Sequence, residues 1–88
     1  MIHIFTCQEK YILAIKEGRK TFEARKPKKK YPVMVGDELL LKQPDGGQQV
    51  QVEVTYVIHI SEVERLYGME PGNNLEVYGL KLKEVGGC

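Results

Sequence analysis

Five stretches of the chain are predicted to be strands, and several of them alternate apolar with polar positions. Alternation with a period of two residues is typical of a strand with one buried face, so each stretch predicts a strand. In the second stretch, this rule turns Phe22 and Ala24 toward the core and places Thr21, Glu23 and Arg25 together on the opposite face. The five predicted strands span residues 2–7, 21–25, 38–43, 48–60 and 75–83.

The fourth stretch has the clearest pattern in the chain. Every second residue from Val50 to Ile60 is apolar, which predicts one continuous buried face along the whole strand. Asp45-Gly46-Gly47, just before it, is typical of a tight turn. The third and fourth predicted strands should therefore form a hairpin.

Two other segments have the apolar spacing of a helix. The first follows Thr6, a suitable N-cap residue with Glu9 three positions on, and should end at Gly18 after about ten residues. The second, 61–67, repeats the capping spacing at Ser61 and also ends at a glycine. Both helices are predicted to be short, with a polar side toward water.

The predicted order is β-α-β-β-β-α-β in a single α+β domain over residues 1–88, with 86–88 as a flexible tail. Five strands and two short helices in so few residues favour a small barrel-like mixed sheet, because a curled sheet exposes few edges. A basic loop, 26–32, and a turn at 35–37 join the second strand to the third.

Composition narrows the class of protein. The chain has 88 residues, of which 42% are apolar and 28% charged, as in ordinary soluble domains. No apolar run is long enough to span a membrane, and the charged start does not resemble a signal peptide. Two cysteines are too few for a disulfide scaffold, and no ligand spacing predicts a metal. We expect a cytoplasmic monomer without cofactor.

The distribution of charge is more informative than the net charge of +1. Residues 16–30 carry +6, and the rest of the chain carries −5. A basic segment on an acidic body attracts a polyanion to one place, although many lysine-rich stretches are simply solvated loops.

The stretch Gly18-Arg19-Lys20-Thr21-Phe22-Glu23-Ala24-Arg25 contains the pattern G-x-K-x-x-E-x-R between the first helix and the second strand. Together with the helix before it, the 35–37 turn and the long central strand, it resembles the ASCH domains of the PUA-like superfamily. Among these, the chain looks most like short, often phage-associated ASCH-like proteins.

The resemblance implies a PUA-like barrel with a cleft for RNA or a modified nucleoside or nucleotide. A carboxylate flanked by two cations suits that role, because it accepts from a base amino group while the cations contact phosphate. We therefore expect Glu23 to line the cleft with Lys20 or Arg25 within reach, although the two charges on this strand could equally form a simple surface ion pair. The predicted binding residues are Lys20, Thr21, Glu23, Arg25, Lys28, Lys29, Lys30 and Tyr31.

One branch of the family consists of amidohydrolases that deacetylate N4-acetylcytidine with a Lys, a Thr and a Glu. Lys20 matches the Lys position, but Glu23 occupies the Thr position, so the nucleophile is missing. Glu64 and Glu70 are the candidates for the third residue. A hydrolase acting on a modified nucleoside or on RNA through Lys20 and Glu23 remains the alternative to a binding module.

Other residues point less clearly to a function. His3 and His59 have no carboxylate or cysteine at ligand spacing and are expected to be ordinary strand residues. Cys7 is expected to be a small buried residue. Tyr31, beside the basic loop, is the one tyrosine expected to stack on a base; the others should be half-buried in the barrel. A third hypothesis is a protein-interaction domain that binds a partner at a strand edge.

Overall fold

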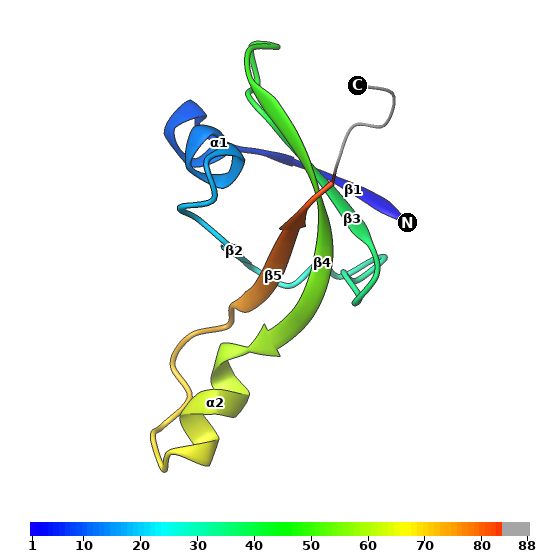
Figure 1. Cartoon of the computed structure of the whole chain (residues 1–88). Helices are drawn as coiled ribbons and strands as arrows, with labels where there is room; N and C mark the ends of the chain where they lie inside the picture. Colours follow the sequence, from blue (N-terminus) through cyan, green and yellow to red (C-terminus); the bar gives the residue numbers. More distant parts are fainter. Residues whose placement is uncertain (84–88) are drawn as a thin grey trace.

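The structure, a computed structural model, describes residues 1–83, so the tail predicted at 86–88 lies outside the described residues. The seven predicted elements are all present and follow one another in the predicted order (Figure 1). They are β1 (Ile2–Thr6), α1 (Glu9–Lys16), β2 (Phe22–Arg25), β3 (Glu38–Lys42), β4 (Gln49–His59), α2 (Ile60–Leu66) and β5 (Glu76–Leu82).

The strands form one sheet in the order β1-β3-β4-β5-β2. β1 pairs with β3 in parallel, and the other neighbouring pairs are antiparallel. The sheet curls into a half-barrel, with β1 and β2 as its two edges and α1 packed beside β3 and β4 (Figure 1). This is the small α+β, PUA-like architecture that the sequence predicts.

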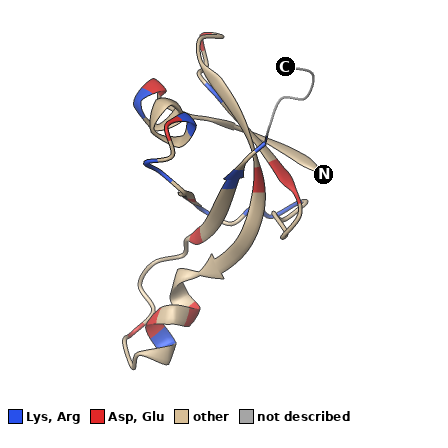
Figure 2. Cartoon of the chain, in the orientation of Figure 1, with Lys and Arg blue, Asp and Glu red and all other residues tan. Residues whose placement is uncertain are grey.

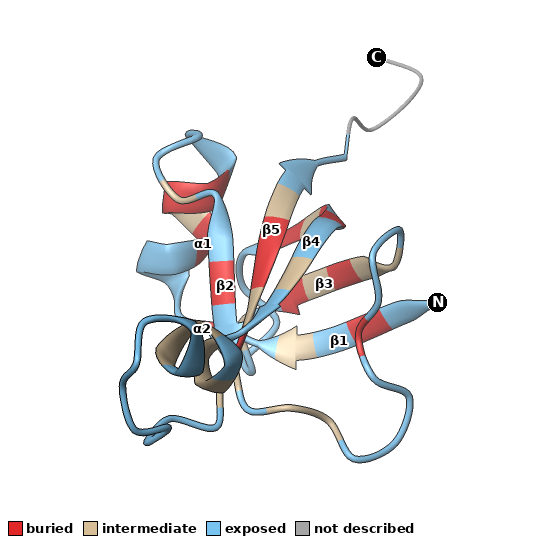
Figure 3. Ribbon diagram, turned by 90° about the horizontal axis from the view of Figure 1, so that it is seen from below, coloured by how far each residue is buried: buried red, intermediate tan, exposed pale blue. Residues whose placement is uncertain are grey.

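The core lies between α1 and the concave side of the sheet, where Figure 3 shows buried positions on the facing elements. α1 contributes Ile12 and Ile15, both almost fully buried, because they fall one turn apart on the same side of the helix. The sheet contributes Leu39 and Leu41 from β3 and the alternating valines Val50, Val52 and Val54 from β4.

The predicted helix caps are wrong. α1 begins after Gln8, and α2 begins after His59; neither N-cap side chain bonds the helix. Thr6 is instead the last residue of β1, and Ser61 lies inside α2. Pairing extends each neighbouring strand up to the helix, and the backbone hydrogen bonds of the sheet outweigh the preference of a single side chain for a cap. α1 is accordingly shorter than predicted, at eight residues.

The predicted continuous apolar face of the fourth strand is also wrong beyond Val54. The pairing of β4 with β5 shifts between Val54 and Tyr56, which leaves Thr55 as an extra residue. One extra residue reverses which side chains point inward. Val57 therefore packs on the core, whereas Tyr56 and Ile58 are 42% and 40% exposed.

Tyr56 covers Gly79 on the neighbouring strand. A Cβ at Gly79 would collide with the Tyr56 ring, so this position in β5 accepts only glycine without rearrangement. The close approach fixes the shifted pairing of β4 and β5.

The face assigned to the second strand is reversed in the structure. Phe22 is 48% exposed and Ala24 is exposed, whereas Glu23 is only 7% exposed. β2 pairs with β5 so that Glu23 lies opposite the buried Tyr78. The polar side of this strand thus faces the interior, which is tolerated because the interior supplies partners for the carboxylate.

α2 projects from the end of β4, away from α1 (Figure 1). None of its residues is fully buried, and Gly68 follows it with a φ of 72°. Neither described helix is long and apolar enough to cross a membrane.

Candidate functional site

Three residues of the G-x-K-x-x-E-x-R motif meet at one carboxylate. Lys20 Nζ donates to Glu23 Oε1 at 3.1 Å, and Arg25 Nη2 donates to Glu23 Oε2 at 3.2 Å. Glu23 and Arg25 share a strand face because they are two residues apart. Lys20 lies in the loop that precedes β2, and its side chain extends toward Glu23. The Glu23 side chain is 10% exposed, but those of Lys20 and Arg25 are 18% and 28% exposed. The acid therefore lies beneath two cations that reach solvent.

Cys7 lies next to the same carboxylate, with its Sγ 3.9 Å from Glu23 Oε2. It is buried, as the sequence predicts. Burial raises the pKa of the Cys7 thiol, and the negative charge of Glu23 raises it further. The residue is therefore a neutral thiol at the floor of the site, because a reactive thiolate requires a lowered pKa.

Arg25 also joins the two edges of the half-barrel. Its Nη2 donates to the carbonyl oxygen of Thr6 at 2.7 Å, and its guanidinium lies 4.9 Å from the centre of the Phe5 ring. Both partners belong to the β1 edge, whereas Arg25 belongs to the β2 edge. A side chain thus bridges the two edge strands where no strand pairing closes the barrel.

A hollow of about 310 Å³ opens beside this cluster. It lies between the end of β1, the start of α1 and β2. The residues that line it are Thr6, Cys7, Gln8, Tyr11, Glu23, Ala24 and Arg25.

Tyr11 is the residue of this site that sequence analysis missed. The helical spacing suggested a half-buried position, but Tyr11 is 42% exposed and lines the hollow. Lys10 Nζ and Lys20 Nζ lie 5.0 Å and 5.4 Å from the centre of its ring. An aromatic residue that follows two charged residues in the first turn of the helix before the motif would have been the signal for it.

Lys20 lies between two aromatic rings. Its ammonium is 5.4 Å from the centre of the Phe22 ring as well as from that of Tyr11, and it donates to the Phe22 carbonyl at 2.8 Å. Thr21 is exposed, and its carbonyl accepts from the Leu80 amide at 2.9 Å. Lys20 and Thr21 both line a small hollow of about 120 Å³ on the other side of the motif.

The predicted residues of the basic loop do not form one cluster. Lys28 points inward, with its Nζ 3.0 Å from His3 Nδ1 and 5.7 Å from the centre of the Phe5 ring. Lys29 and Lys30 are exposed. Tyr31 is 66% exposed with a φ of 51°, and it does not line the hollow beside Glu23.

Both histidines have carboxylate partners that sequence spacing did not reveal. His3 Nε2 lies 2.8 Å from Asp37 Oδ2, and His59 Nδ1 lies 3.2 Å from Glu76 Oε2. In each case the acid comes from another part of the chain, so only the pairing of strands brings it close. Among residues 1–83, no group of three or more acidic, histidine or cysteine side chains is placed to hold a metal ion.

The proposed third residue of a hydrolase does not lie near the motif. Glu64 is on α2, where its carboxylate accepts from the backbone amides of Gly72 and Asn73 at 3.3 Å each. Glu70 is exposed in the loop that follows α2. Neither lines the hollow beside Glu23.

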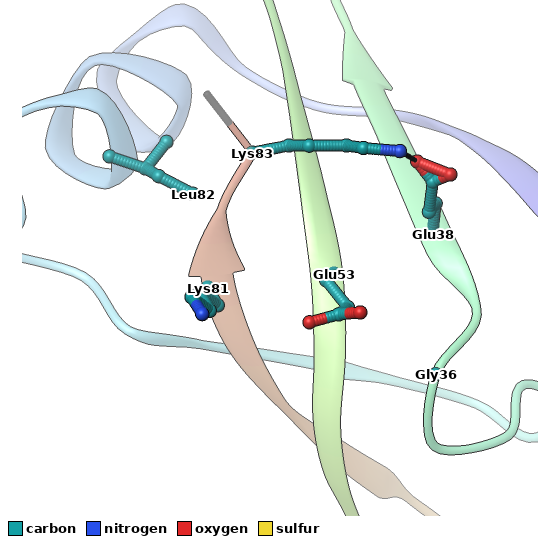
Figure 4. A pocket seen from close by; sticks show the side chains of 6 residues that line it. All are labelled: Gly36, Glu38, Glu53, Lys81, Leu82 and Lys83. Carbon is teal, nitrogen blue, oxygen red and sulfur yellow. Dashed lines mark hydrogen bonds and ion pairs between the residues drawn. The ribbon is translucent and has the colours of Figure 1, made fainter. Parts of the chain in front are cut away.

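A larger hollow, of about 500 Å³, lies over β3, β4 and β5 (Figure 4). Two acidic and two basic side chains line it, so its charges balance. Lys83 pairs with Glu38, and Gln51 donates to the same carboxylate at 2.9 Å. These donors lower the pKa of Glu38. Despite its size, this hollow is electrostatically less favourable for a polyanion than the motif, because its lining is neutral overall and two cations flank one acid at the motif.

The charge pattern of the whole molecule agrees with that assignment. Figure 2 shows basic residues on the approach to β2 and along the loop after it, residues of both signs on α1, and two acidic residues with one basic residue on α2. The basic loop is therefore a more favourable place for an anion than the α2 end.

Comparisons with known proteins agree with this fold. No curated protein matches the chain. Among solved structures, the crystal structure of hypothetical protein PH0355 is similar, with a TM-score of 0.65 and 19% sequence identity over 94% of this chain and 100% of that chain. At that identity the likeness supports the fold alone. The model of the ASCH domain family matches residues 5–85. The chain therefore belongs to the ASCH domain family.

Proposed function

We propose that this ASCH domain binds RNA, or a modified nucleoside or nucleotide, in the hollow beside Glu23. The observation that carries the proposal is a buried carboxylate with Lys20 at 3.1 Å and Arg25 at 3.2 Å, at the wall of a cavity of about 310 Å³. Such a carboxylate can accept from the exocyclic amino group of a base, as single-stranded RNA allows, and the flanking cations can contact phosphate.

The size and lining of the hollow support a single base as the group recognised. Its volume lies at the lower end of the range of small-molecule sites. Tyr11 offers a partly exposed ring at its wall, and aromatic rings are the usual stacking partners of unpaired bases. Lys29 and Lys30 would add phosphate contacts outside the hollow, and Tyr31 a second stacking surface.

The remaining parts of the proposal follow the family. ASCH domains are PUA-like domains, a fold associated with RNA binding, and the motif resemblance implies the same cleft. We propose that the chain is of the short, phage-associated type that it resembles. Glu23 stands where the amidohydrolase branch has its Thr, which argues against that branch. A cytoplasmic monomer with RNA or a nucleotide as its partner completes the proposal.

Salt dependence of RNA binding tests the electrostatic part. If four to six phosphates are contacted, log K against log[salt] should have a slope of roughly −3 to −4 for a single strand. Replacing Lys28, Lys29 and Lys30 with Ala should weaken binding to all sequences and reduce that slope by up to about 2. Lys81→Ala, an exposed lysine of β5, is the control. An unchanged slope in the triple variant would remove the loop from the site.

Glu23→Gln separates binding from catalysis. For a binding module, loss of the charge should change base preference by about 1–3 kcal/mol and leave non-specific affinity nearly intact. For a hydrolase that uses Glu23 as base, turnover of N4-acetylcytidine or RNA should fall roughly 100-fold or more, with little change in substrate binding. Turnover that survives Lys20→Ala would come from another site. A variant that changes neither preference nor turnover would show that Glu23 is structural.

A further inference from the structure

The inner side of the edge strand β1 contacts the cations of the site. His3, Phe5 and Cys7 alternate along this strand and its end, so their side chains point the same way. Phe5 lies against Arg25 and Lys28, and Cys7 lies against Glu23. The third member of the row, His3, contacts no motif residue and bonds instead to Lys28 and Asp37.

The His3 side chain is almost completely buried, at 1% exposure. Its Nε2 lies 2.8 Å from Asp37 Oδ2, and its Nδ1 lies 3.0 Å from Lys28 Nζ. A lysine ammonium can only donate, so Nδ1 must be the acceptor and Nε2 must carry the proton that Asp37 accepts. The contacts therefore specify one neutral tautomer of the ring.

Asp37 is itself fixed by the turn that it ends. The Met34 amide donates to its Oδ2 at 3.1 Å, and the Met1 amino group lies 3.4 Å from its Oδ1. The hydrogen bond from His3 is the main cause that lowers the pKa of the Asp37 carboxyl. Asp37 thus holds the ring of His3 as an ionised acceptor, and the ring holds Lys28.

Lys28 and Arg25 lie near the same aromatic ring. Its ammonium lies 5.7 Å from the centre of the Phe5 ring, and the Arg25 guanidinium lies 4.9 Å from the same centre. The bond to His3 occupies one of the three donors of the ammonium, which leaves the others for a ligand. Lys29 and Lys30, by contrast, are exposed side chains on the same loop.

We propose that His3, oriented by Asp37, is a positioning residue that fixes Lys28 as a phosphate contact beside Arg25. This inference rests on the proposed RNA-binding function and names the part of the basic loop that is pre-organised for it. A lysine held in place loses less conformational entropy on binding than a free one, so Lys28 contributes more affinity than its neighbours.

The charged groups that face His3 are Lys28 from the loop and Asp37 from the turn, with the Met1 amino group bonded to Asp37. The neutral ring therefore links the loop to the turn through one donor and one acceptor.

A double-mutant cycle on binding of a single-stranded oligouridylate tests the coupling. His3→Leu and Lys28→Met should each weaken binding by roughly threefold to tenfold and reduce the salt slope by about 0.7, as expected for one lost phosphate contact. The double variant should be no weaker than Lys28→Met alone. Lys30→Met is the matched control, and its effect should multiply with that of His3→Leu.

A second variant keeps the test decisive if His3→Leu folds poorly. In His3→Asn the amide oxygen replaces the Nδ1 acceptor, so most of the affinity should return, and its effect should again depend on the presence of Lys28.

The outcomes distinguish this inference from the function on which it rests. Binding by the wild type with independent effects of His3→Leu and Lys28→Met, or with no recovery in His3→Asn, would overturn the positioning role and leave the RNA-binding function standing. Absence of oligouridylate binding by the folded wild type at low salt would overturn both.

Discussion

Two acidic residues, Glu23 of β2 and Glu76 of β5, are buried on the inner side of adjacent strands but have different kinds of partner. Glu23 is held by two cations, Lys20 at 3.1 Å and Arg25 at 3.2 Å, and it borders a hollow. Glu76 accepts from the hydroxyl of the fully buried Tyr78 at 2.9 Å and lies 3.2 Å from His59.

The difference shows which of the two acids is available to a ligand. The cations over Glu23 are partly exposed and can exchange a bond to the carboxylate for one to phosphate or water. The Tyr78 hydroxyl over Glu76 is enclosed, so that pair is a fixed part of the core, although the other partner of Glu76, His59, is 46% exposed. Burial alone therefore does not distinguish the two acids. Glu23 differs because two cations hold it and because it lines a hollow.

Truncation of the two acids should affect stability unequally, and this is the largest effect we expect. Glu76→Ala leaves the buried Tyr78 hydroxyl without a partner and opens a cavity, so the free energy of unfolding should fall by about 2–4 kcal/mol. Glu23→Ala should cost about 1 kcal/mol, because its cations can turn to water. Urea denaturation of both variants measures the difference. Equal losses would mean that Glu23 is as much a core residue as Glu76.

Alkaline pH should destabilise the protein through the Glu76 cluster. Burial raises the pKa of Tyr78, and the hydrogen bond and charge of Glu76 raise it further. A raised pKa in the folded state means that the stabilisation is complete below the ordinary tyrosine pKa of about 10 and is lost as the pH rises above it.

The measurement is the urea midpoint of wild type and Tyr78→Phe between pH 8 and pH 11. At pH 8, Tyr78→Phe should have a lower free energy of unfolding than wild type. Above about pH 10 this difference should narrow by up to about 1.4 kcal/mol per pH unit. A constant gap would show that the folded and unfolded states titrate this hydroxyl alike.

The smallest expected effect uses Cys7 as a reporter of the charge on Glu23. Glu23 is one of the causes that raise the thiol pKa, so Glu23→Gln should lower that pKa and speed alkylation of Cys7 by about threefold at pH 8. Glu76→Gln should leave the rate unchanged. Mass spectrometry of the modified peptide separates Cys7 from Cys88. Equal rates in the two variants would place the charge of Glu23 out of reach of the thiol.

The local pattern of the chain was enough to predict the order of its elements. Alternation predicted the strands, glycines marked the helix ends, and Asp45-Gly46-Gly47 predicted the hairpin of β3 and β4. The motif also placed Glu23 and Arg25 on one strand face, because side chains two positions apart in a strand point to the same side whatever the strand packs against. Each of these inferences depends on neighbours in the sequence.

The direction in which each strand faces depends on its partners, and local pattern alone did not determine it. Thr55 is an ordinary strand residue by type, yet it becomes an extra residue in β4 because of how β4 pairs with β5. β2 then pairs with β5 so that Glu23 faces inward and Phe22 outward, the reverse of what apolarity predicts. Cys7 beside Glu23, His59 beside Glu76, and Lys28 and Asp37 beside His3 all come from other strands and loops. A buried polar group is stable only where such partners meet it, and the fold of the whole chain decides where that happens.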